Sequence, residues 1–149
     1  MTTTTTDKTM DTCNALLRGE ISATETYAQA IAKYASTAEG KSLARIFAEH
    51  EKSADALRLL IQECGAEPSY SSGIWGGFVQ ALEGAATLMG ESPALTILQQ
   101  GEEHGRNVYL AALENADVSD QAKELIRQEL LPPLTDHLNE LQKLRETIA

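Results

Sequence analysis

Four ionisable residues interrupt the apolar stripes of this chain, and their side chains are of the kinds that bind transition metals. They are Glu20, His50, Glu102 and His137, in the order Glu, His, Glu, His. Burying a carboxylate or an imidazole in a helical core is costly unless the group is paired or bound to an ion. Four such residues at corresponding positions therefore predict either a metal site or a set of buried ion pairs.

The segments that carry these residues have the spacing of amphipathic helices, because apolar residues recur three and four positions apart. We predict long helices over about 9–35, 37–64, 92–114 and 120–148, the second opened by a capping box of Ser36 and Glu39. A shorter segment rich in small residues, 73–90, is long enough to travel back along a bundle as a crossover helix. The predicted fold is all-α, an antiparallel four-helix bundle with this short crossover helix between its second and third helices.

An internal repeat relates the first and third helices. Glu20 is followed seven residues later by Tyr27, and Glu102 is followed seven residues later by Tyr109. Seven residues are close to two helical turns, so each tyrosine lies on the same face as its glutamate. We expect the tyrosine hydroxyls to supply hydrogen bonds around a metal site.

The spacing within each hairpin predicts which residues lie at the same height. Glu20 precedes the turn near residue 36 by about 16 residues and His50 follows it by about 14, so the two should face one another. Glu102 and His137 fit less well, because their distances from the second turn differ by about five residues, or about 7 Å. Pro132 and Pro133 must kink or interrupt the last helix, which offers a way to absorb the difference.

Composition excludes several classes of partner. The formal net charge of −10 repels phosphate backbones and anionic membrane surfaces, so we expect neither nucleic acid nor membrane as a partner. No segment resembles a signal peptide or a spanning helix. The threonine-rich residues 1–8 predict a disordered tail, followed by one domain over 9–149.

The cysteines and a second apolar stripe indicate location and assembly. Cys13 and Cys64 fall on apolar stripes and match no metal-binding spacing, so we interpret them as buried residues in the reducing cytoplasm of a bacterial-type protein.

His104 lies with Ile97 and Val108 on a second stripe of the third helix, where a packing role is expected. The crossover or another subunit must cover that stripe, which favours a homo-dimer or a higher homo-oligomer.

Several short motifs are similar to those of the ferritin-like superfamily, and more closely to a bacterial ferritin-like domain family of unknown function. They are Leu17-Arg18-Gly19-Glu20, Thr26-Tyr27, Glu49-His50, Gly73-Ile74-Trp75-Gly76 and Gly101-Glu102-Glu103-His104-Gly105. The resemblance covers nearly the whole chain after the threonine tail. It implies a ferritin-like bundle and suggests a di-iron or di-manganese carboxylate site.

The chain departs from the ligand pattern of that superfamily. Di-metal members carry Glu-x-x-His on the second and fourth helices. Here Phe47 stands three residues before His50, and Leu134 three before His137. Two of six ligands are therefore missing, and a mononuclear site made by Glu20, His50, Glu102 and His137 is the remaining metal hypothesis.

Two functions follow from the residues. In the first, the bundle binds iron, manganese or zinc at the four residues. In the second, no metal is bound: Glu20 pairs with His50 and Glu102 with His137, and the protein is a structural or interaction module that uses the Trp75 region. Catalysis beyond metal chemistry has no support, since the chain contains no phosphate loop, nucleophile elbow or Cys–His pair.

Overall fold

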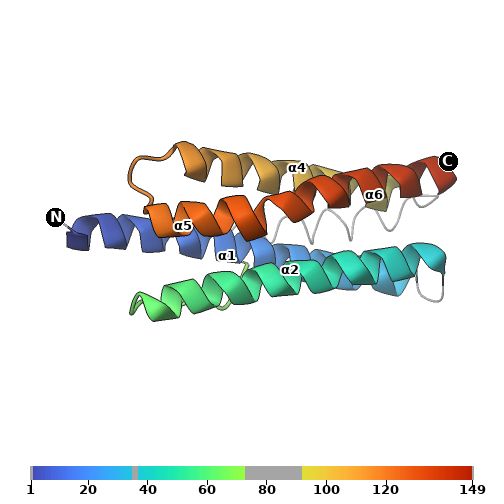
Figure 1. Ribbon diagram of the computed structural model, residues 1–149. Helices are drawn as coiled ribbons and strands as arrows, with labels where there is room; N and C mark the ends of the chain where they lie inside the picture. Colours follow the sequence, from blue (N-terminus) through green and yellow to red (C-terminus); the bar gives the residue numbers. More distant parts are fainter. Residues whose placement is uncertain (1, 35–36, 73–91, 149) are drawn as a thin grey trace.

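The chain forms two helical hairpins that pack side by side (Figure 1). The computed structural model describes residues 2–34, 37–72 and 92–148. These residues contain no strand, so the predicted all-α bundle is confirmed for them; the predicted crossover helix, 73–90, lies outside the described residues. The elements are α1 (Thr2–Lys33) and α2 (Ala38–Glu63) in the first hairpin, and α4 (Ser92–Glu114), α5 (Asp120–Leu125), the π-turn η2 (Ile126–Leu130) and α6 (Pro132–Ile148) in the second.

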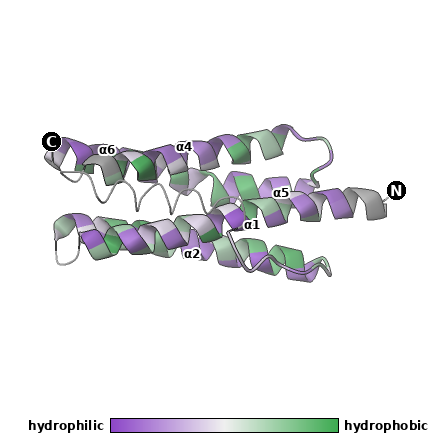
Figure 2. Cartoon of the chain, turned by 180° about the vertical axis from the view of Figure 1, so that it is seen from behind, coloured by the Kyte–Doolittle hydropathy of each residue, from purple (hydrophilic) through white to green (hydrophobic). Residues whose placement is uncertain are grey.

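Two apolar clusters fill the bundle, one toward each end. The first cluster includes Leu17, Leu57 and Ile126, and the second includes Leu43, Leu95 and Leu141. Green and purple turns alternate along each helix in Figure 2, as expected for helices that bury one face only. Among the described residues, no helix is both long enough and apolar enough to cross a bilayer.

Local sequence signals fix the ends of α2. Thr37 is the N-cap, and its hydroxyl oxygen accepts a hydrogen bond from the Gly40 N–H at 3.0 Å. At the other end Gly65 has a φ of 80°, which glycine adopts without strain, and the Ala66 N–H donates to the Ile61 carbonyl at 3.0 Å. The Thr37 cap lies in the short connection between α1 and α2, which leaves the two helices antiparallel with Glu20 and His50 at one height.

The last helix is interrupted where the two prolines predict it. The π-turn η2 immediately precedes α6, and the Leu131 N–H donates to the Ile126 carbonyl at 2.9 Å. Pro132 opens α6, where its missing N–H costs least. A π-turn places an additional residue in a turn, so the chain advances less per residue. This is the direction needed to bring His137 back to the height of Glu102.

The amino-terminal residues differ from the prediction of a disordered tail over 1–8, because α1 begins at Thr2. A buried hydroxyl ties the start of this helix to the opposite hairpin. Thr9 donates to the Asp117 carbonyl at 3.1 Å and accepts from the Ser119 N–H at 2.9 Å. The spacing of apolar residues gave no sign of this contact, which joins residues more than a hundred positions apart.

One of the two cysteines departs from the predicted burial. Cys13 is buried in the first apolar cluster, as expected, and burial together with the nearby Cys64 raises the pKa of its thiol to about 11. Cys64 is exposed, because it caps the end of α2, beyond the last turn that packs on the core. Both cysteines are free thiols.

Candidate metal centre

The four residues singled out by type and spacing converge between the two apolar clusters. Glu20 comes from α1, His50 from α2, Glu102 from α4 and His137 from α6, and each is no more than 5% exposed. Glu102 and His137 meet despite the mismatch of their sequence distances. The predicted burial and the predicted Glu–His contacts are therefore confirmed.

His50 lies between two carboxylates. Its Nδ1 is 2.8 Å from Glu20 Oε2, and its Nε2 is 2.6 Å from Glu102 Oε1. Burial acts to lower the pKa of His50, but the charges of Glu102 and Glu20 and their hydrogen bonds outweigh it and raise this pKa well above 6.5. The two carboxylates thus favour the charged form of the ring when no ion is bound.

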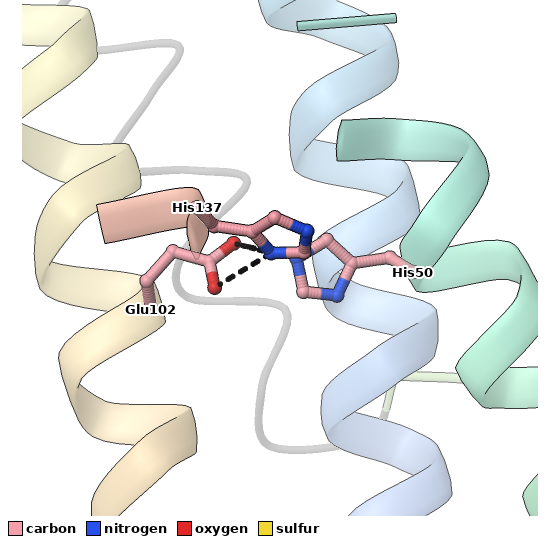
Figure 3. A group of neighbouring side chains, drawn as sticks. All are labelled: His50, Glu102 and His137. Atoms are coloured by element: carbon pink, nitrogen blue, oxygen red, sulfur yellow. Dashed lines mark hydrogen bonds and ion pairs between the residues drawn. The ribbon is translucent and has the colours of Figure 1, made fainter. Parts of the chain in front are cut away.

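Glu102 is the centre of the network (Figure 3). Besides His50, His137 Nδ1 lies 3.2 Å from its Oε1 and 3.3 Å from its Oε2, and the Tyr27 hydroxyl donates to Oε1 at 2.8 Å. Burial acts to raise the pKa of this carboxyl. The charge of His50 and the hydrogen bonds from both histidines outweigh it and lower the pKa to about 2.

Each tyrosine of the repeat donates a hydrogen bond to the glutamate of the other hairpin. Tyr27 on α1 donates to Glu102 on α4, and Tyr109 on α4 donates to Glu20 on α1 at 2.9 Å. Burial, followed by the charge of the glutamate that each tyrosine touches, raises both tyrosine pKa values well above 10, so both hydroxyls remain protonated donors. The tyrosines supply the hydrogen bonds that the repeat predicts, and each reaches across to the other helix.

Glu49 is a member of the network that the sequence patterns did not reveal. Its Oε1 lies 2.6 Å from His137 Nε2, although it comes from α2 and His137 from α6. Glu49 is off the core stripe of α2, about 100° around the helix from His50. In a bundle this direction points to a neighbouring helix. The sequence does contain a signal for this residue: an acidic residue precedes each histidine of the site, in Glu49-His50 and in Asp136-His137.

Three of the four predicted residues can hold one metal ion. Donor atoms of His50, Glu102 and His137 all lie within 4.8 Å of one another, and all three residues are buried. Two imidazoles and a carboxylate are donors that suit iron, manganese and zinc. Glu20 lies outside this group, because it contacts the ring nitrogen of His50 that points away from Glu102. His104 is exposed rather than packed in the core, and it is not part of the cluster.

The network is complete in its hydrogen bonds. Among the described residues, no buried side-chain nitrogen or oxygen lacks a hydrogen-bond partner. The rings of Tyr27 and His50 stack with centroids 5.3 Å apart, and those of His50 and His137 lie 4.9 Å apart. Hydrogen bonds and ring contacts together direct one nitrogen of each imidazole toward Glu102.

No protein-family model matches the chain, and no curated protein or solved structure is detectably similar to it. Membership of the ferritin-like superfamily therefore stays a prediction from the sequence motifs. Function has to be inferred from the cluster.

Proposed function

We propose that this protein binds one divalent transition-metal ion at His50, Glu102 and His137, inside a ferritin-like four-helix bundle. The observation that supports this most strongly is the convergence of three buried donors from three helices. The donor set fits iron, manganese or zinc. When bound, such an ion supplies Lewis acidity, and iron or manganese adds one-electron chemistry.

The surroundings of the three donors support the same proposal. The ring nitrogen of His50 that points away from Glu102 lies 2.8 Å from Glu20, and the corresponding nitrogen of His137 lies 2.6 Å from Glu49. Metal-binding histidines commonly donate their second N–H to a carboxylate, which fixes the tautomer and the ring orientation. Glu20, predicted as a ligand, is thus assigned a positioning role.

Charge gives further support. Two imidazoles are surrounded by the carboxylates of Glu20, Glu49 and Glu102. These carboxylates place negative charge around the inward ring nitrogens, which offsets the charge of a divalent ion bound there and lowers the electrostatic cost of binding.

A metal-free structural role is the second candidate, and one distance favours it. His50 Nε2 and Glu102 Oε1 are 2.6 Å apart, the separation of a hydrogen bond. Two tetrahedral ligands about 2.1 Å from one ion would lie roughly 3.4 Å apart. The cluster would have to open by several tenths of an ångström to bind metal, whereas the ion-pair network needs no change.

Metal titration separates the two candidates. Untagged protein stripped with chelator and titrated with Fe²⁺, Mn²⁺ or Zn²⁺ is expected to bind about one ion per chain, since three donors define one site. His50→Ala and His137→Ala should each abolish this binding. His104→Ala is the matched control, because it removes the third histidine from outside the cluster. Stoichiometric binding that survives both cluster variants, or no binding by the unaltered chain, would refute the metal proposal.

The tyrosines provide a graded test of the assignment. Tyr27→Phe is expected to weaken metal affinity about tenfold, because it removes a hydrogen bond to the proposed ligand Glu102. Tyr109→Phe is the matched control. It removes the corresponding tyrosine hydroxyl, but this one donates to Glu20, which contacts the proposed ligand His50 and is not itself a proposed ligand. Isothermal titration of both variants checks the order. A larger loss for Tyr109→Phe would show that Glu20, rather than Glu102, carries the site.

Three sequence-based expectations belong to the same proposal. The ferritin-like relationship is supported by Glu on α1 and α4 and His on α2 and α6 at one level of the bundle. A cytoplasmic location is supported by two free thiols. Assembly as a homo-dimer or higher homo-oligomer, with no nucleic acid or membrane as partner, rests on the apolar stripe and the acidic charge alone.

A further inference from the structure

The carboxylates around the proposed metal site differ in their exposure to solvent. Toward α1 and α4 the site adjoins a cavity of about 50 Å³, whose lining includes Glu20, His50 and Glu102 themselves and is otherwise largely apolar or small, as at Leu16 and Ala23. Toward α2 and α6 it ends at Glu49, whose side chain is 39% exposed. The side chains of Glu20 and Glu102 are only 6% and 1% exposed. Within the described residues, Glu49 is thus the carboxylate that connects the cluster to solvent.

A displaceable cation stands at this exposed end. The Arg45 guanidinium lies 3.7 Å from Glu49 Oε2 and 3.8 Å from Glu140 Oε1, and its side chain is 51% exposed. The Ser42 hydroxyl donates to Glu140 Oε1 at 3.0 Å and holds that carboxylate in place. Half-exposed ion pairs at these distances are weak. Arg45 can therefore turn into solvent and leave two carboxylates, one from α2 and one from α6, facing an incoming cation.

We propose that Glu49 is the access residue through which a divalent cation reaches the buried site. Glu49 and Glu140 attract the hydrated cation as Arg45 leaves, and Glu49 releases His137 Nε2 so that the ring can turn and admit the cation to Glu102. On the cavity side the carboxylates among the described lining residues are the buried Glu20 and Glu102, which do not reach the surface to meet a hydrated ion. This inference rests on the proposed metal-binding function. It goes beyond it by naming the route.

Metal-binding kinetics test the route, because an access residue and a positioning residue change different rate constants. Cobalt(II), followed by its visible absorbance in a stopped-flow instrument, is the probe. Glu49→Gln keeps an amide oxygen that can accept from His137, but it removes the charge. We expect its association and dissociation rate constants to fall together by about tenfold, with the Kd changed less than threefold. The association rate should also lose much of its dependence on ionic strength.

Two further variants complete the design. Glu51→Gln is the matched control, because it makes the same change of charge at an exposed position on the same helix; its association rate should equal that of the unaltered chain. Arg45→Gln removes the competing cation and touches neither proposed ligand, so it should raise the association rate about threefold. This surface variant tests the route even if Glu49→Gln does not fold.

Each remaining outcome is decisive. An unchanged association rate with faster dissociation in Glu49→Gln would show that Glu49 only orients His137, which overturns the route and leaves the metal site intact. An equal slowing by Glu51→Gln would show a general effect of surface charge and would also overturn the route. Failure of the unaltered chain to bind cobalt(II), iron(II), manganese(II) or zinc(II) would remove the metal site and the route together.

Discussion

His50→Ala is expected to lower the free energy of unfolding of the metal-free protein by about 3–5 kcal/mol. The imidazole bridges Glu20 and Glu102, with ring nitrogens 2.8 and 2.6 Å from their oxygens. Its removal leaves two buried carboxylates facing a small void without their cation. Chemical denaturation in the presence of a chelator measures the loss. His104→Ala should change stability by about 0.5 kcal/mol or less, since that histidine is exposed.

Compensating substitutions should recover much of this loss. Glu20→Leu with His50→Leu replaces a charged pair by an apolar pair on the same stripe, which is often neutral or stabilising. Tyr109 then loses the acceptor for its buried hydroxyl, so adding Tyr109→Phe should restore further stability. A loss below about 1 kcal/mol for His50→Ala, or no recovery in the combined variants, would contradict a buried ion-pair network.

Bound metal should remove the pH dependence of stability that His50 gives the metal-free protein. In the metal-free protein, the raised pKa of His50 stabilises the fold fully below its unfolded pKa of about 6.5. That contribution is lost as pH rises through the higher folded pKa. The lowered pKa of Glu102 contributes above its unfolded value of 4.5 and is lost as pH falls through about 2. These two groups together give greatest stability between about pH 4.5 and 6.5.

The increment in stability that metal adds has the opposite slope, because protons compete with the ion for the imidazoles; the two slopes should cancel in the metal-bound protein above about pH 6.5. Between pH 6.5 and 8.5 the melting temperature should fall with chelator present, while the increment produced by saturating metal should grow. Displacement of one proton from His50 changes stability by about 1.4 kcal/mol per pH unit, or about 3–5 °C. Thermal unfolding with and without metal measures both slopes. A metal increment that is zero at every pH would favour the metal-free structural role.

The pH experiment has an internal control in the histidine itself. His50→Gln keeps polar atoms near Glu20 and Glu102 but does not titrate in this range. In that variant the fall in melting temperature above pH 6.5 should flatten. If the melting temperature of His50→Gln falls with pH as steeply as that of the unaltered chain, the proton belongs to a group other than His50.

Much of the site follows directly from the sequence. Helical periodicity assigns each residue an angle around its helix, which predicts the burial of Glu20, His50, Glu102 and His137. Distance along a hairpin assigns height, so Glu20 and His50 could be paired. The seven-residue repeat placed Tyr27 and Tyr109 beside the glutamates. These are local quantities, set by 3.6 residues per turn and 1.5 Å per residue.

Only the tertiary structure decided how the two hairpins meet. The sequence spacing separated Glu102 from His137 by about 7 Å in height, yet their side chains lie 3.3 Å apart. The π-turn η2 recovers only about 1.5 Å of that height, so the packing of the second hairpin supplies the rest. Burial of Cys64 was wrongly predicted, because a stripe does not reveal where packing against it stops. Glu49 was missed because its angle points to α6, a neighbour that pattern analysis of α2 cannot see. Periodicity fixes what each helix buries; packing between helices fixes which atoms touch, and hence which residues can share a metal ion.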